Sequence, residues 1–142
     1  MYVVDTSVFI ADVQPHEIHH AEAYTFLEKA RIENWQLYAP TILLAEIGAA
    51  LSRGANNTTL AYQIIRKWQQ SPFLHHIPID HALSRIAADI AIRQRIRGCD
   101  AVYVALAQHL GFALVTLDRQ QHDRVSPSVS TYTPDEINNH HN

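Results

Sequence analysis

The chain has 142 residues, of which 47% are hydrophobic and 18% are charged, and this composition predicts one compact domain rather than a disordered chain. No apolar run approaches the ~20 residues that span a bilayer, and we see no secretory signal pattern at the N-terminus. Cys99 is the only cysteine, which excludes an internal disulfide and favours the cytoplasm. The net charge of -3 argues against avid non-specific binding of nucleic acid, although local basic patches are compatible with it.

Short apolar strands alternate with helical patterns along the chain. Strands are expected at residues 2–4, 36–39, 74–79 and 112–117, with an edge strand at 129–132. Helices are expected at 6–11, at 15–32 with Pro15 as the first residue, at 42–53 behind a Thr41 cap, and at 58–70, 81–97 and 100–110. This alternation predicts an α/β fold with a central parallel sheet of four to five strands and helices on both faces. We expect a single domain over residues 1–134 and a polar tail at 135–142.

Four acidic residues stand in apolar surroundings. Asp5 ends the first strand and Asp118 ends the apolar run FALVTL. Glu46 is the only charge in YAPTILLAEIGAALS, and Asp100 is the only Asp, Glu, Lys or Arg between residues 98 and 117. A lone carboxylate in apolar surroundings is costly unless something pairs with it. Because each acid falls near a strand end or early in the following helix, we expect all four to share one site.

Each of these acids also has a purely structural interpretation. Asp5 and Asp118 could cap strand ends, and Asp100 could cap a helix beside Gly98. Glu46 lies beyond the first helical turn and would instead need a buried arginine partner. The coincidence of four such residues favours the shared site.

Four converging carboxylates would need a cation. Two carboxylates about 5 Å apart repel by about 3 kcal/mol at an effective dielectric constant near 20. Oxygen ligands alone select hard divalent ions such as Mg²⁺ or Mn²⁺. Such an ion keeps several waters, one of which can attack a phosphodiester.

Four segments, in their order and spacing, resemble PIN-domain ribonucleases, and most of all the VapC-type toxins of type II toxin–antitoxin pairs: VVDTSVFI, TILLAEIGAAL, IRGCDAVYVALA and LVTLD. The resemblance extends to a late VSTYTPDE segment and so covers nearly the whole chain. It implies a PIN-like three-layer α/β/α fold and a Mg²⁺- or Mn²⁺-dependent endoribonuclease that hydrolyses RNA through a metal-bound water. It also implies a cognate antitoxin and a homodimer. By motif match, the metal-binding and catalytic acids would be Asp5, Glu46, Asp100 and Asp118.

The same resemblance gives roles to short hydroxyl residues. Ser7 is expected to orient a metal ligand or a water, and Thr6 is the alternative for this role. Thr116 matches a position that often carries Ser or Thr in the family, and Asp123 is an additional candidate acid.

Basic residues flank the acids in the sequence. Arg93, Arg97 and Arg119 could hold RNA phosphates beside the acidic site, whereas a solvated helix face is the alternative for Arg95, which is expected to point away from Arg93 and Arg97.

Three alternatives to a toxin nuclease remain open. Residues 16–20, HEIHH, match the HExxH pattern of zinc peptidases through His16, Glu17 and His20. Against this interpretation, Pro15 places His16 at the start of a helix and no obvious third ligand follows. The others are a housekeeping RNA-processing nuclease and a non-catalytic PIN-like binding module; the latter differs in that its acids would not bind metal.

Overall fold

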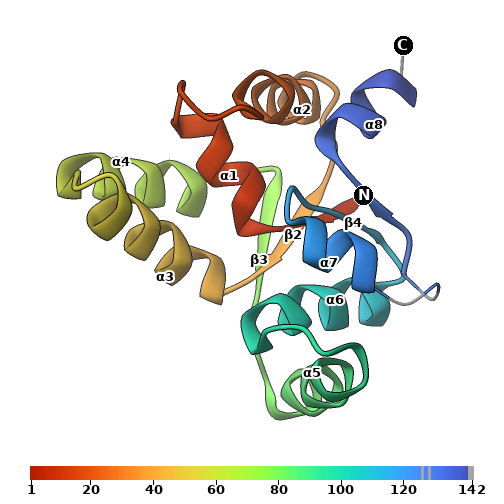
Figure 1. The fold of residues 1–142 in the computed structure, drawn as a ribbon. Helices are drawn as coiled ribbons and strands as arrows, with labels where there is room; N and C mark the ends of the chain where they lie inside the picture. Colours follow the sequence, from red (N-terminus) through yellow and green to blue (C-terminus); the bar gives the residue numbers. More distant parts are fainter. Residues whose placement is uncertain (126, 128, 141–142) are drawn as a thin grey trace.

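A five-stranded parallel sheet forms the centre of the computed structural model, which describes residues 1–125, 127 and 129–140 (Figure 1). From one edge to the other the strands are β3 (Leu74–Ile77), β2 (Leu37–Pro40), β1 (Tyr2–Val4), β4 (Ala113–Val115) and β5 (Thr131–Tyr132). β1 is therefore the middle strand, with Val3 opposite Tyr38 on one side and Leu114 on the other. Val3 and Val4 are fully buried, as expected for a strand covered on both faces.

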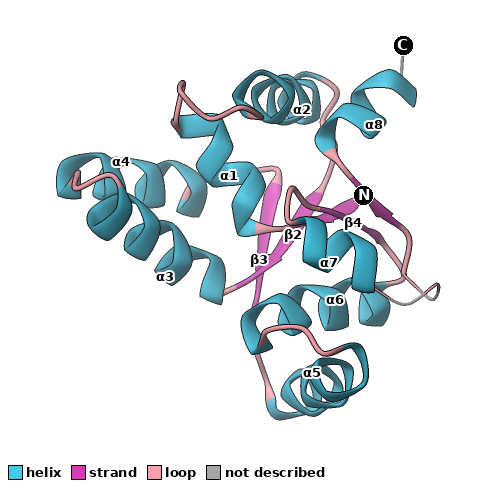
Figure 2. Cartoon of the chain, viewed as in Figure 1, coloured by secondary structure: helices cyan, strands magenta, loops and turns pink. Residues whose placement is uncertain are grey.

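Helices cover both faces of this sheet, which confirms the predicted α/β/α layers (Figure 2). One face is covered by the helices α1 (Thr6–Val13), α2 (His20–Ile32), α3 (Ile42–Ala49) and α4 (Thr58–Gln69). The other face is covered by α5 (His81–Gln94) and α6 (Gly98–Leu110). The short α7 (Arg119–Arg124) follows β4. Within residues 1–125, 127 and 129–140, none of the helices combines the length and apolar character that a membrane span requires.

Helix α6 lies against the middle of the sheet, where it contacts β1, β2 and β4. Six of its thirteen residues are buried, in keeping with its almost wholly apolar sequence. Gly111 ends the helix with a φ of 69°, a left-handed conformation that glycine adopts without cost. In the other helical layer, Phe9 of α1 packs edge-on against Trp68 of α4 with ring centroids 4.8 Å apart.

Helix boundaries differ from the prediction in several places: α1 runs on to Val13, α5 ends at Gln94 instead of residue 97, and α2 begins later than expected. Residues 15–19 form turns and α2 begins at His20, so the prediction of Pro15 as a first helical residue is wrong. The turns satisfy the backbone locally, because the Glu17 amide donates to the Gln14 carbonyl at 2.9 Å.

The helix predicted at 42–53 is also divided. Thr41 lies in the helical region of φ and ψ and makes no side-chain capping bond within the described residues, so the predicted Thr41 cap is wrong. α3 ends at Ala49 and continues as the π-helix η1 (Ala50–Gly54). The Ser52 hydroxyl donates to the Gly48 carbonyl at 2.6 Å, a side-chain bond of the kind that perturbs regular helical bonding.

The C-terminal residues form a helix rather than the polar tail expected at 135–142. Helix α8 (Pro134–His140) packs against α2, with Ile137 only 3% exposed. It begins with a capping box: Glu136 accepts from the Thr133 amide at 2.7 Å, and the Glu136 amide donates to the Thr133 hydroxyl at 3.3 Å. The Asn138 side chain donates to the Glu22 carbonyl of α2 at 3.0 Å. These contacts extend the folded domain to residue 140, while residues 141–142 of the expected tail lie outside the described residues.

Candidate active site

Asp5 is the buried acid at the end of β1, with 6% of its surface exposed. Its Oδ2 caps α1 by accepting from the Ser7 amide at 3.0 Å, and it accepts from the Thr116 hydroxyl at 3.4 Å. Burial raises the pKa of Asp5 to about 6, against the lowering effect of the Ser7 hydrogen bonds, and the charges of Asp100 and Glu46 add to the rise. Asp5 therefore caps a helix and also lies close enough to Asp100 and Glu46 for their negative charges to act on it.

Glu46 projects from α3 onto two hydroxyl groups. The Thr6 hydroxyl donates to Glu46 Oε1 at 2.9 Å, and the Tyr103 hydroxyl donates to the same oxygen at 2.8 Å. The two hydroxyl oxygens lie 2.6 Å apart. Burial raises the pKa of Tyr103, and the nearby Glu46 charge raises it further, so the phenol stays protonated and able to donate. Hydroxyl donors thus hold Glu46 where the sequence had suggested a buried arginine as the structural alternative.

Arg97 joins the remaining two acids. It precedes α6, and its Nε donates to Asp100 Oδ2 at 2.8 Å while its Nη2 donates to Asp118 Oδ2 at 3.0 Å. The Arg97 side chain is 73% exposed, whereas the Asp100 and Asp118 side chains are only 13% and 24% exposed. Asp118 also caps α7 by accepting from the amides of Gln120 and Gln121 at 2.8 and 3.2 Å. One exposed guanidinium therefore bridges two mostly buried carboxylates and offsets one of their two negative charges.

Two hydroxyl residues fix the end of β4 against α1. The Ser7 hydroxyl accepts from the Leu117 amide at 3.0 Å, and the Thr116 hydroxyl accepts from the Asp118 amide at 3.0 Å. Thr116 is fully buried. Thr6, Ser7 and Thr116 thus all lie at the acidic site, where each binds an acid or the backbone next to one.

Three other predicted residues form no hydrogen bond or ion pair with the four acids among the described residues. Asp123 has a 74% exposed side chain that pairs with His122. Arg93 binds Asp89 on its own helix, Nε to Oδ1 at 3.0 Å. Arg119 is exposed at the start of α7.

The HEIHH segment does not assemble as a zinc site in the described residues. His16 is exposed in the turn before α2. His20 donates from Nδ1 to the Ala11 carbonyl at 2.8 Å, and His19 pairs with Glu22. The histidines of the pattern thus have separate structural partners.

The described residues contain no group of three or more His, Cys, Asp or Glu side chains arranged to hold a metal ion. The donor chemistry nevertheless fits a hard divalent cation, because the cluster offers only carboxylate and hydroxyl oxygens. A cation, the Arg97 guanidinium, already bridges Asp100 and Asp118. In donor chemistry, the residues of the cluster therefore suit a hard divalent cation.

Sequence reasoning missed two residues of the cluster. Tyr103 follows Asp100 by three positions, the spacing of neighbours on one helix face, and this was a usable signal. Gln121 is 1% exposed and donates from Nε2 to the Asp100 carbonyl at 3.2 Å. Its sequence surroundings, RQQHD, carry no sign of burial.

The class of protein follows from this geometry: a three-layer α/β domain whose parallel sheet gathers acidic residues at its carboxyl edge. The chain belongs to the PIN domain family, whose sequence profile matches residues 2–126. A search of curated proteins gives no match.

Solved structures with the same fold include chains from toxin–antitoxin complexes. VapC20 from Mycobacterium tuberculosis, described as a sarcin–ricin loop cleaving toxin, is 16% identical with a TM-score of 0.74 over 92% of this chain and 99% of that chain. VapBC2 from Rickettsia felis, bound to a promoter DNA fragment, is 16% identical with a TM-score of 0.71 over 93% and 97%. FitAcB from Neisseria gonorrhoeae is 21% identical with a TM-score of 0.68 over 94% and 98%. At these identities the likeness establishes the fold.

Proposed function

We propose that this protein is a Mg²⁺- or Mn²⁺-dependent endoribonuclease and the toxin of a toxin–antitoxin pair. The observation that carries the proposal is the convergence of Asp5, Glu46, Asp100 and Asp118 at one edge of the sheet, with a single exposed arginine as counter-charge. Membership of the PIN family and the full-length likeness to the VapC20 and VapBC2 chains support it.

The four acids would hold the divalent ion. When bound, the ion neutralises charge on the scissile phosphate and acidifies a water. Thr6 and Tyr103 fix Glu46 by donating to Oε1, and Thr116 and the Ser7 amide do the same for Asp5. Preorganised groups of this kind lower the cost of reorganisation during reaction.

Arg97 would exchange one anionic partner for another. Its side chain is held to Asp100 and Asp118 from the solvent side. Once free of these carboxylates, the guanidinium would be able to bind an RNA phosphate beside the site.

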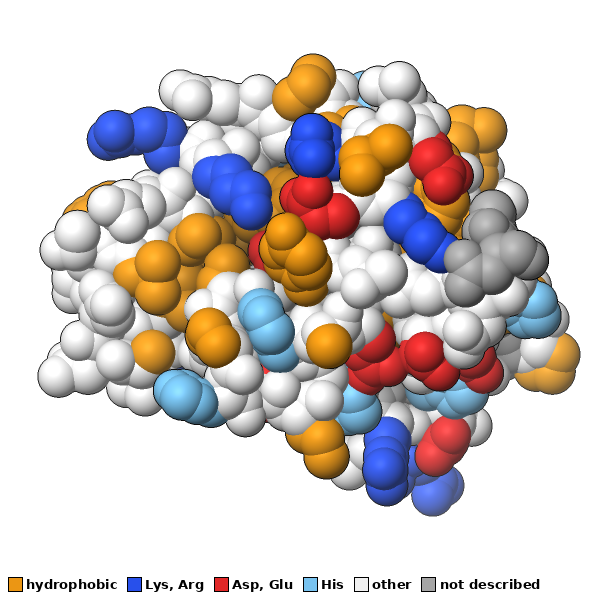
Figure 3. Space-filling view, turned by 90° about the horizontal axis from the view of Figure 1, so that it is seen from above, with side chains coloured by type: hydrophobic (Ala, Val, Ile, Leu, Met, Phe, Trp, Pro, Cys, Tyr) orange, Lys and Arg blue, Asp and Glu red, His pale blue; other side chains and the backbone are white. Residues whose placement is uncertain are grey.

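Recognition of RNA would depend on shape more than on overall charge. Figure 3 shows acidic and basic side chains interspersed over the face seen from above, rather than one basic stripe. The net charge of -3 agrees with this distribution. We therefore expect cleavage of selected, unpaired RNA segments in the cytoplasm, by a homodimer that a cognate antitoxin inhibits.

Cleavage of a mixed pool of structured RNA tests the nuclease. We expect cleavage with Mg²⁺ or Mn²⁺ but not with EDTA, and its loss in Asp100→Asn. Asp89→Asn is the matched control, because Asp89 is an exposed acid on α5 that pairs only with Arg93 among the described contacts. If neither cleavage nor Mn²⁺ binding occurs, the enzyme is refuted and the non-catalytic binding module is favoured.

Induced expression in a bacterial host separates a toxin from a housekeeping nuclease. The toxin should arrest growth, and Asp100→Asn should relieve the arrest. Cleavage in vitro with normal growth would instead favour RNA processing.

A further inference from the structure

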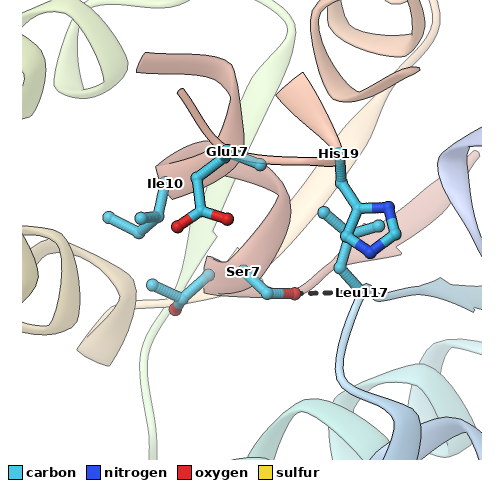
Figure 4. A pocket seen from close by; sticks show the side chains of 7 residues that line it. Ser7, Ile10, Glu17, His19 and Leu117 are labelled. Atoms are coloured by element: carbon cyan, nitrogen blue, oxygen red, sulfur yellow. Dashed lines mark hydrogen bonds between the residues drawn. The ribbon is translucent and has the colours of Figure 1, made fainter. Parts of the chain in front are cut away.

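A cavity of about 320 Å³ lies directly beside the acidic residues (Figure 4). One wall is α1, with Thr6, Ser7 and Ile10; the others are Leu117 after β4 and Glu17 and His19 from the turn before α2. Thr6 and Ser7 follow Asp5 in the chain, and Leu117 precedes Asp118. A group in this cavity would therefore sit next to a phosphate held at the acids.

The walls of the cavity combine apolar faces with a carboxylate. Figure 4 shows the Glu17 carboxylate, the His19 ring and the Ile10 and Leu117 side chains around the same space. The hydrogen bond of His19 to Glu22 holds its ring in orientation. Small-molecule sites have volumes from about 300 Å³ upwards, and RNA-binding proteins stack unpaired bases on aromatic side chains, of which His19 is the one lining this cavity. The cavity suits one flat, polar-edged heterocycle.

The carboxylate limits which base fits. An ionised glutamate only accepts hydrogen bonds, and its two oxygens lie side by side. Guanine presents two adjacent donors on its Watson–Crick edge, N1–H and the 2-amino group. Adenine, cytosine and uracil each place an acceptor beside their donor, and this acceptor would face the negative charge of Glu17.

We propose that this cavity is a guanine-specificity pocket, in which Glu17 accepts hydrogen bonds from N1–H and the 2-amino group of an unpaired guanine next to the cleaved bond. The inference rests on the proposed nuclease function and assigns a substrate feature to it. It also gives a role to the HEIHH segment other than zinc binding.

Single-atom changes in the RNA test the pocket. Short unpaired RNA oligonucleotides would carry either one guanine or one inosine, which lacks only the 2-amino group, and kcat/KM would be measured with Mn²⁺. We expect the wild type to prefer guanine roughly tenfold or more. In Glu17→Ala this ratio should fall towards one, whereas Glu33→Ala, an exposed acid at the far end of α2, should keep it.

A binding measurement separates the pocket from the chemistry. Fluorescence anisotropy of the same labelled oligonucleotides, with Asp100→Asn and Asp100→Asn/Glu17→Ala, should show guanine preference only in the first. Cleavage without any preference for guanine over inosine, or a preference that survives in Glu17→Ala, overturns the pocket and leaves the nuclease standing. Guanine-selective binding without cleavage by the wild type overturns the nuclease and leaves the pocket standing. Absence of both overturns both.

Discussion

Replacing Asp5 by Asn tests whether the buried carboxylate destabilises the metal-free fold. Its pKa is raised from 3.8 to about 6, first by burial and then by the charges of Asp100 and Glu46. Between about pH 4 and pH 6 the folded protein keeps a proton that the unfolded chain has released. The free energy of unfolding therefore falls as the pH rises through this window, and the full penalty applies above about pH 6.

The size of the effect follows from the same two values. A pKa that rises from 3.8 to about 6 corresponds to about 3 kcal/mol at neutral pH. Asn is as good an N-cap as Asp, so the bond from the Ser7 amide is retained. We expect metal-free Asp5→Asn to be about 1–3 kcal/mol more stable than the wild type above pH 6, which raises Tm by roughly 3–10 °C.

Denaturant unfolding in EDTA between pH 4 and pH 8 measures this difference. Asp80→Asn is the matched control, because Asp80 caps α5 by accepting from the Leu83 amide at 2.8 Å but is exposed. The control should stay within about 0.5 kcal/mol of the wild type and keep its pH dependence. A less stable Asp5→Asn protein, or one that keeps the wild-type loss of stability between pH 4 and pH 6, would refute the reasoning.

Two further substitutions address the partners of the acids. Arg97→Gln should bind Mn²⁺ about 2- to 10-fold more tightly in calorimetry, because the exposed guanidinium no longer competes for Asp100 and Asp118. An unchanged affinity would show that Arg97 does not occupy the place of the ion. Tyr103→Phe removes a donor to Glu46 and should lower the free energy of unfolding by about 1–2 kcal/mol in urea, together with the rate of RNA cleavage. Wild-type cleavage by this variant would mean that Thr6 alone positions Glu46.

The acids could be predicted because a parallel sheet imposes their meeting place. Asp5 directly follows β1 and Asp118 lies three residues after β4, and parallel strands bring their carboxyl ends to one edge. The partners of Arg97 could not be predicted in this way. They depend on the turn between α5 and α6, where Arg95 adopts a left-handed conformation with a φ of 55°. Local sequence gives no reason for a non-glycine residue to do so.

The C-terminal helix shows the opposite case, in which a local signal was present. The sequence TPDE at 133–136 has the spacing of a capping box and a proline at the first helical position. The residues that follow are mostly polar, and polar composition alone predicts a tail. Tertiary contacts with α2, through Ile137 and Asn138, make this short helix part of the domain.

The central place of β1 governs when the site can exist during synthesis. Its neighbours are β2 and β4, and β4 is made only after residue 112. Asp118 lies 113 positions after Asp5, and the synthesis of the residues between them takes roughly 6–23 s at ordinary rates of translation. A nascent chain that has not reached Asp118 thus lacks the assembled acids, so the proposed site cannot form before β4 and Asp118 have been synthesised.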